Sequence, residues 1–185
     1  MKMHLWIVCC ALTLSACRGD TPLDKPEPVT MTRDALGHYC QMHLYEHPGP
    51  KAQVHLAGLP EPLFFAQVRD AIAYQRMPEQ THTIRAIYVS DMAKAQSWSE
   101  PGIDNWTSAD EAIYVVGSRK SGGMGAAELV PFSDKIAADD FMKANGGKLL
   151  KLSQISDDMV LSPVDMNLDE SGNFIPPSNG SNPHN

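Results

Sequence analysis

Cysteine is scarce in this 185-residue chain, and its distribution leaves one thiol for the folded part. The four cysteines stand at positions 9, 10, 17 and 40, and the first three fall in an N-terminal targeting segment. A lone Cys40 cannot close an intramolecular disulfide, so the chain is not a disulfide-stabilised scaffold. In an exported protein such a thiol is either an inert buried side chain or an available ligand or nucleophile.

The chain also lacks an apolar run long enough to span a membrane at its N-terminus. The run from Leu5 to Leu14 is too short, and it follows a short positive start at Met1-Lys2. It ends in Leu14-Ser15-Ala16-Cys17, which is typical of the cleavage site of a bacterial lipoprotein. We therefore predict a signal peptide over residues 1–16 and acylation, including palmitate, at Cys17.

Basic clusters are missing as well, and the formal charge of the chain is −7. Removal of residues 1–16 takes away one lysine and no acid, which leaves −8. An acidic chain of this kind is a poor ligand for nucleic acid or anionic lipid headgroups. Membrane attachment would depend on the acyl chains at Cys17, facing the periplasm. Arg18, rather than Asp, follows that cysteine and favours the outer membrane over the inner one.

Composition divides the mature chain into three parts. Residues 17–33 hold three prolines and little to bury, so they are predicted to form a lipid-anchored tether. Residues 162–185 are rich in Pro, Gly, Ser and Asn and are predicted to be disordered. The folded part is then 34–161, enough for one modest core or two very small ones.

The folded part shows one pattern twice, in units at about 37–92 and 110–158. Each unit has the order strand–strand–helix–strand, which predicts an α+β fold. In the first unit we expect strands at 52–56, 63–66 and 84–89 and a helix at 68–77. In the second we expect strands at 112–116, 128–132 and 149–155 and a helix at 134–145. Phe65 and Phe132 occupy matching places, 67 residues apart.

The most informative motif is a thiol two residues before a thioether, Cys40-Gln41-Met42. If residues 38–43 are extended, positions 40 and 42 share a face and their sulfurs lie side by side. A thiolate and a thioether form a soft donor pair, which suits Cu(I) far better than Mg²⁺, Ca²⁺ or Mn²⁺. A site with few ligands and exchangeable thioethers also suits a carrier that must release its metal.

A third sulfur is available from Met124, which stands between Gly123 and Gly125. Glycines let a backbone approach another group closely, so this segment is either a flexible arm over the Cys40–Met42 pair or an exposed hairpin tip. The sequence leaves both interpretations open.

Three histidines lie near the thiol. His38 shares the expected face with Cys40, His43 points away, and His47 precedes a proline at a turn. Cys40, His43 and His47 partly match a zinc pattern, but structural zinc needs a closed set of four ligands and no second cysteine is available. Zinc is the weaker hypothesis, and which histidine joins the site stays open.

The same residues resemble the signature of the NosL family, accessory lipoproteins of nitrous oxide reductase. The resemblance rests on Cys40-Gln41-Met42, on the lipoprotein cleavage site, on the Gly-Gly-Met124-Gly segment, and on Glu46-His47-Pro48-Gly49-Pro50-Lys51-Ala52-Gln53. It implies a Cu(I) chaperone that helps assemble the catalytic copper–sulfide centre of that enzyme in denitrification.

The family resemblance also implies a fold, partners and ligands. The fold is two ββαβ units similar to a domain of organomercurial lyase. The partners are nitrous oxide reductase and a membrane complex of an ABC transporter and a periplasmic β-helical protein. Cys40 and Met42 match the motif ligands, and Met124 matches the third. A homodimer that shares copper is an open alternative to a monomer.

Two other functions compete with a copper carrier. One is a thiol enzyme or redox protein, with Cys40 as nucleophile and His38 or His43 as base. It lacks a second cysteine and gives Met42 no role, so we predict that the chain is not an enzyme. The other is a metal-free scaffold that binds a partner through Trp98 and Trp106 in the linker between the units, residues 90–111, although both are expected to cover the small cores.

Overall fold

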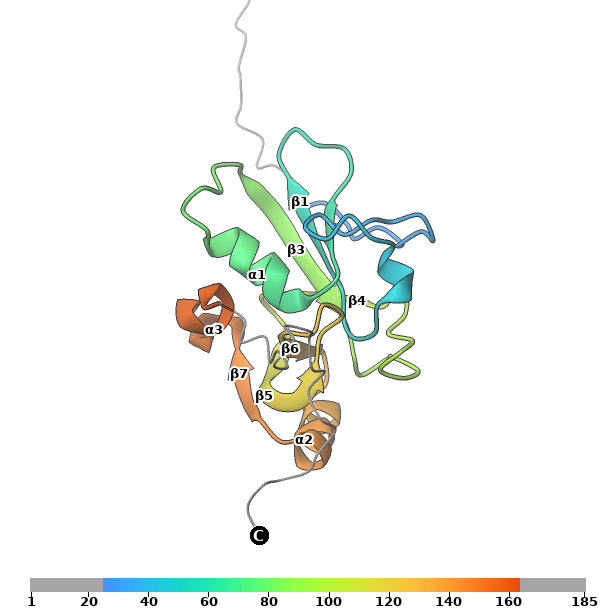
Figure 1. Cartoon of the computed structure of the whole chain (residues 1–185), viewed down its shortest axis with the longest axis vertical. Helices are drawn as coiled ribbons and strands as arrows, with labels where there is room; N and C mark the ends of the chain where they lie inside the picture. Colours follow the sequence, from blue (N-terminus) through green and yellow to red (C-terminus); the bar gives the residue numbers. More distant parts are fainter. Residues whose placement is uncertain (1–24, 164–185) are drawn as a thin grey trace, which may run out of the picture.

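The computed structural model describes residues 25–163, which form two antiparallel sheets with helices packed against them (Figure 1). The predicted signal peptide, Cys17 and the predicted tail beyond residue 163 lie outside this range. None of the helices between residues 25 and 163 has the length and apolar character required to cross a membrane. The α+β class predicted from the sequence is confirmed.

The first sheet has four strands in the order β2-β1-β3-β4, all antiparallel. Its elements are β1 (Ala52–Leu56), β2 (Leu63–Phe65), α1 (Val68–Arg76), β3 (Ile84–Ser90) and β4 (Trp106–Ser108). Every residue of β1 is buried, because the strand lies in the middle of the sheet. A 3-10 helix, η1 (Leu44–Glu46), precedes β1.

The second sheet has three antiparallel strands in the order β6-β5-β7. Its elements are β5 (Ile113–Ser121), β6 (Ala127–Phe132), α2 (Lys135–Asn145) and β7 (Lys148–Lys151). The Asp134 carboxylate caps α2 by accepting a hydrogen bond from the Ala137 N–H, and Gly146 ends the helix at φ 76°. A 3-10 helix, η2 (Leu152–Gln154), and α3 (Asp157–Leu161) follow.

The two units match in register as well as in order. Phe65, in β2, pairs with Ala52 at the start of β1, and Phe132, in β6, pairs with Ile113 at the start of β5. Both phenylalanines are buried. The predicted repeat is therefore confirmed. The strand β5 is longer than expected, because the chain accommodates Gly117 in a register shift and pairing resumes at Ser121.

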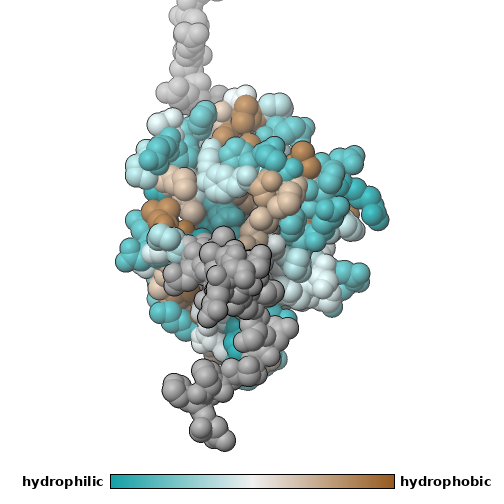
Figure 2. All heavy atoms as spheres, in the orientation of Figure 1, coloured by the Kyte–Doolittle hydropathy of each residue, from teal (hydrophilic) through white to brown (hydrophobic). Residues whose placement is uncertain are grey.

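One hydrophobic cluster joins the two units. Ala71 and Ile72 of α1 pack in the same cluster as Tyr114 of β5 and Leu129 of β6. Trp98 and Trp106 are partly buried against the smaller clusters, as predicted. On the face shown in Figure 2, apolar side chains form separate brown patches among polar ones. Because the first of these clusters contains residues of both units, the two units share a core.

Residues 25–33 lie against the first sheet. The Val29 N–H donates to Gln53 Oε1 and its carbonyl accepts from Gln53 Nε2, at 2.9 and 3.0 Å. Met31 is 3% exposed and packs with Leu44 and Ala66. The ordered contacts thus begin before residue 34, which the sequence analysis predicted to be the first residue of the folded part. The side-chain amide of Gln53 accounts for this, since it satisfies both backbone groups of Val29.

Candidate metal centre

The Cys40 motif lies in a tight loop. An antiparallel bridge between Leu36 and His43 closes the loop, and the Gly37 N–H donates to the Met42 carbonyl at 3.0 Å. Gln41 takes a left-handed conformation with φ 55°, which lets the chain reverse. The expectation that residues 38–43 are extended is wrong, because the bridge requires a reversal between its two ends. The same-face argument for positions 40 and 42 therefore does not apply.

Cys40 is a partly buried free thiol. It packs against the small cluster of Met31, Leu44 and Ala66. A Cβ atom at Gly37 would collide with its sulfur, so the loop requires glycine at that place. The thiol is thus held by close packing on one side.

Met124 lies in the β5–β6 hairpin loop, and its side chain is 41% exposed. The Gly122 N–H donates to the Ala126 carbonyl at 2.8 Å, and the Gly125 N–H donates to the Gly122 carbonyl at 2.9 Å. Gly125 has φ 85°, a conformation that favours glycine. The loop is therefore defined by its own hydrogen bonds, with Met124 at its turn.

Cys40 and Met124 line the same cavity, of about 310 Å³. They are 84 residues apart in the sequence. Met42, whose side chain is 40% exposed, is not among the residues between 25 and 163 that line this cavity. The other residues that line the cavity are mainly apolar or aromatic: Tyr39, Phe65, Ala66, Gln67, Asp70 and Ala126. Two of the three predicted ligands thus meet at one hollow.

A direct contact joins the two loops. The Nδ1 atom of His47 lies 3.1 Å from the Gly123 carbonyl oxygen. A Cβ atom at Gly123 would lie 2.8 Å from His47 Cβ and 3.1 Å from the Pro48 carbonyl oxygen. Only glycine fits so close to this backbone. The sequence-based expectation that these glycines allow a close approach is thus supported by the structure.

The other histidines of the motif have different surroundings. His38 packs edge-on against Phe65 and Tyr74, at ring-centroid distances of 5.5 and 5.6 Å. His43 is exposed. Within residues 25–163, no three His, Cys, Asp or Glu side chains group in a way that could hold a metal ion. The zinc interpretation, which needs Cys40, His43 and His47 together, therefore has no support in the described part of the chain.

Buried polar residues beside the cavity were not identified from the sequence. Gln67 is 2% exposed, and its Oε1 accepts hydrogen bonds from the Met124 and Ala126 N–H groups. Its Nε2 donates to Asp70, whose pKa is raised by burial. The sequence feature that could have indicated Gln67 is its place as a polar residue at the start of the predicted helix, two residues after Phe65.

Glu128 is also buried, at the N-terminus of α1. It accepts hydrogen bonds from the Val68 and Arg69 N–H groups, at 3.3 and 3.0 Å. Burial raises the pKa of Glu128 to about 8, against the opposing effect of the backbone N–H groups of Arg69 and Leu129. The carboxyl group is thus held largely protonated at neutral pH.

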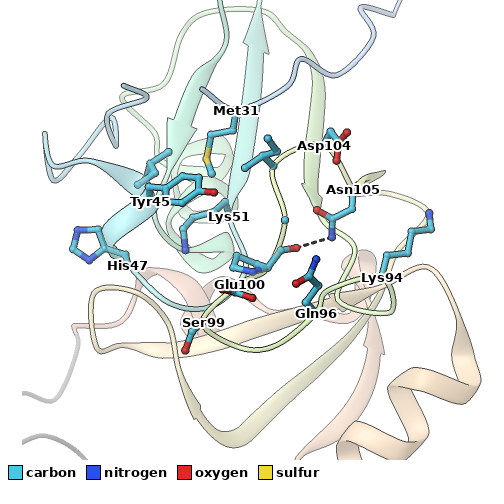
Figure 3. Close-up of a pocket in the computed structure, with 14 residues that line it drawn as sticks. Met31, Tyr45, His47, Lys51, Lys94, Gln96, Ser99, Glu100, Asp104 and Asn105 are labelled. Carbon is cyan, nitrogen blue, oxygen red and sulfur yellow. Dashed lines mark hydrogen bonds between the residues drawn. The ribbon is translucent and has the colours of Figure 1, made fainter. Parts of the chain in front are cut away.

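Lys51, which follows Pro48-Gly49-Pro50, is buried. Its Nζ donates to the Pro48 and Gly49 carbonyls at 3.1 and 2.6 Å. Burial lowers the pKa of Lys51 to about 8, and attraction to Glu128 and Cys40 opposes this. Lys51 also lines a second cavity, of about 440 Å³, between the motif segment and the linker. Figure 3 shows Tyr45 and Lys51 on one side of it and the linker residues on the other.

Comparison with known proteins identifies the family. A family model described as NosL matches residues 28–160. The chain belongs to the NosL family. It is 54% identical over 166 residues to the copper-binding lipoprotein NosL of Achromobacter cycloclastes, which covers 89% of this chain and 86% of that protein.

Two further NosL proteins support the assignment. The copper-binding lipoprotein NosL of Stutzerimonas stutzeri is 28% identical over 141 residues, covering 76% of this chain and 72% of that one. The crystal structure of the copper chaperone NosL from Shewanella denitrificans superposes with a TM-score of 0.65 at 30% identity. That match covers 70% of this chain and 96% of the other, so the two share the NosL fold. The family resemblance inferred from the motifs is confirmed.

Proposed function

We propose that this NosL protein binds Cu(I) and carries it to an acceptor protein, with Cys40, Met124 and Met42 as ligands. The observation that carries the proposal is the cavity shared by Cys40 and Met124. A thiolate and a thioether that converge from distant segments form a soft donor pair, which suits Cu(I). The names of the relatives, copper-binding lipoprotein and copper chaperone, agree with this chemistry.

Met42 completes the set by turning its side chain. It follows Cys40 by two residues, and its side chain is 40% exposed, so packing constrains its rotamer less than that of a buried side chain. Methionine has three rotatable bonds, so its sulfur adapts to an ion more easily than a branched side chain does.

The surroundings of the cavity suit transfer rather than storage. Tyr39 and Phe65 give it an apolar wall, while Met124, whose side chain is 41% exposed, leaves it accessible from outside. A thioether is neutral and needs no deprotonation before it binds, so it exchanges readily. An acceptor ligand can therefore enter beside the bound ion before the chaperone's own sulfurs leave.

The acceptor we propose is nitrous oxide reductase, whose catalytic copper–sulfide centre requires assembly outside the cytoplasm. The family signature around Cys40 and the lipoprotein cleavage site before Cys17 support a periplasm-facing lipoprotein in this role. Arg18 favours the outer membrane. We propose the ABC-transporter maturation complex as a further partner in copper delivery. A homodimer that shares one copper ion is the alternative to a monomer, and the titration below distinguishes the two by the number of ions per chain.

The direct test is titration of the reduced mature protein with Cu(I) against a competing chelator. We expect one ion per chain, and we expect the Cys40→Ala variant to lose it. A loaded protein should also pass its ion to apo nitrous oxide reductase faster than the ion dissociates into a chelator solution. Failure of the wild-type protein to retain Cu(I) would reject the proposal in favour of a metal-free scaffold.

A thiol enzyme makes a different prediction for the same variants. Replacement of Met42 by leucine should weaken Cu(I) retention in a chaperone, because a soft ligand is lost. It should leave the reactivity of the Cys40 thiol toward an alkylating reagent almost unchanged. An enzyme that uses Cys40 as nucleophile would show no dependence of metal retention on Met42.

A further inference from the structure

The two repeat units differ at the residue that precedes each helix. Gln67 and Asp134 both stand two residues after the matched phenylalanine, at the N-cap of α1 and α2. Asp134 accepts a hydrogen bond from the Ala137 N–H, at 2.9 Å, and so caps its own helix. Aspartate is among the favoured N-cap residues, and glutamine is not. The first unit thus departs from the second where a capping residue is expected.

The side chain of Gln67 is directed to the Met124 loop instead. Its Oε1 accepts hydrogen bonds from the Met124 N–H at 3.0 Å and from the Ala126 N–H at 3.2 Å. Its Nε2 donates to Asp70 Oδ2 at 3.1 Å. Two N–H donors on one side and a carboxylate on the other define the orientation of the amide.

The missing cap of α1 comes from the other unit. Glu128, in β6, accepts hydrogen bonds from the Val68 and Arg69 N–H groups. The first unit therefore supports the hairpin loop of the second, and the second unit caps the helix of the first. This exchange frees Gln67 from capping and leaves its side chain available for the loop.

We propose that Gln67 is a positioning residue, which holds the backbone of Met124 so that its sulfur stays at the copper cavity. This inference rests on the proposed function of the site. Gly122, Gly123 and Gly125 surround Met124, and glycine has more backbone freedom than any other residue. Hydrogen bonds within the loop and the contact with His47 define its turn, and a further fixed point at Met124 itself reduces the ordering that is required when a metal ion binds. The two hydrogen bonds that Gln67 Oε1 accepts, one buried and one partly buried, supply this fixed point before the ion binds.

The test is a double-mutant cycle on Cu(I) affinity with Gln67→Leu, Met124→Leu and the double variant. We expect Gln67→Leu to weaken Cu(I) binding about tenfold, because the Met124 loop loses one partly buried and one buried hydrogen bond. In the Met124→Leu background the same change should have almost no further effect. A role limited to stability would instead leave the Cu(I) affinity of the folded protein unchanged, and a general disturbance of the site would lower it equally in both backgrounds. Either result would overturn the inference.

Gln53→Leu is the matched control. Gln53 is also fully buried and also holds a backbone segment through both ends of its amide, at Val29. We expect it to reduce the stability of the apo protein as Gln67→Leu does, while its Cu(I) affinity stays within about twofold of wild type. Equal losses of affinity in the two variants would overturn the inference.

A measurement on the wild-type protein covers the case in which Gln67→Leu does not fold. The Met124 and Ala126 amide protons should exchange with solvent far more slowly than in an unstructured peptide, because Gln67 binds both. Exchange at the unstructured rate would overturn the inference. If the wild type shows slow exchange but fails to retain Cu(I), the proposed function fails, and with it the role of Gln67 in metal binding.

Discussion

The His47 ring nitrogen Nδ1 lies 3.1 Å from the carbonyl oxygen of Gly123, although the two residues are 76 positions apart. This contact holds the loop that follows Cys40 against the loop that carries Met124. The other ring nitrogen, Nε2, is buried and finds no hydrogen-bond partner among residues 25–163. The assignment of Nδ1 as the donor to the carbonyl leaves Nε2 with a lone pair.

Gly123→Ala should separate the two loops. The new methyl group would lie 3.0 Å from the Ala66 carbonyl oxygen as well as 2.8 Å from His47 Cβ, and backbone atoms cannot move aside easily. We expect a loss of about 1–3 kcal/mol in the free energy of unfolding. We also expect weaker Cu(I) binding, measured by competition with a chelator.

Gly58→Asn is the control for that variant. Gly58 has a positive φ, of 83°, and within the described part of the chain nothing lies within 4 Å of a Cβ atom there. Asparagine tolerates this conformation. Cu(I) affinity should stay at the wild-type value, and a decrease as large as that of Gly123→Ala would contradict the explanation.

Two methionines of similar exposure should differ in their contribution to Cu(I) affinity. Met124 and Met77 are 41% and 39% exposed, but of the two only Met124 lines the cavity with Cys40. Met124→Leu should weaken Cu(I) binding at least about tenfold, because a soft ligand is lost. Met77→Leu should leave it unchanged. Equal affinities for the two variants in a chelator competition would exclude Met124 as a ligand.

Glu128 should make the stability of the apo protein depend on pH. Burial raises the pKa of Glu128 from 4.5 to about 8, so the folded protein keeps a proton that the unfolded chain loses. The free energy of unfolding should therefore fall as pH rises from about 5 to about 8, by up to about 4 kcal/mol. Glu128→Gln, which keeps a neutral side chain of the same shape, should flatten this dependence.

Denaturant unfolding at a series of pH values measures this effect, with the exposed Glu61→Gln as control. The series should stop near pH 8, because burial lowers the pKa of Lys51 to about 8 and its loss of a proton has the opposite effect. A pH dependence that is the same in wild type and Glu128→Gln would show that Glu128 ionises normally.

Substitution of Asp91 should lower the free energy of unfolding but leave the Cu(I) affinity unchanged. Its buried carboxylate accepts hydrogen bonds from the Ser133 N–H and hydroxyl, at 2.9 and 2.6 Å, and so joins the linker to the second unit. Burial alone would raise the pKa of Asp91, but the hydrogen bonds from Ser133, Lys94 and Ala93 together outweigh it and lower the pKa. Asp91→Ala should therefore cost about 1.5–3 kcal/mol above pH 4, and less as pH falls through that lowered pKa.

Thermal or denaturant unfolding measures the loss, and a chelator competition on the folded variant provides the second readout. Asp91 is not among the residues that line the cavity of Cys40 and Met124. Cu(I) affinity should remain within about twofold of wild type. A large loss of affinity in a folded Asp91→Ala protein would show that the site depends on the linker.

The sequence by itself determined the order of the elements and the family. Strand and helix patterns are local, so β1, α1 and β6 were found within one or two residues of their observed bounds. The paired positions of Phe65 and Phe132 followed from the repeat, and the motif at Cys40 was sufficient to indicate NosL.

Only the tertiary structure decided how the site is built. The loop at Cys40 reverses at Gln41 because it is bridged to Leu36, and a short motif does not reveal such a closure. The hydrogen bonds from the Met124 loop to Gln67 and from the α1 N-terminus to Glu128 join segments about 60 residues apart. Such contacts leave no periodic pattern in either segment, because each depends on where the packed sheets bring the other.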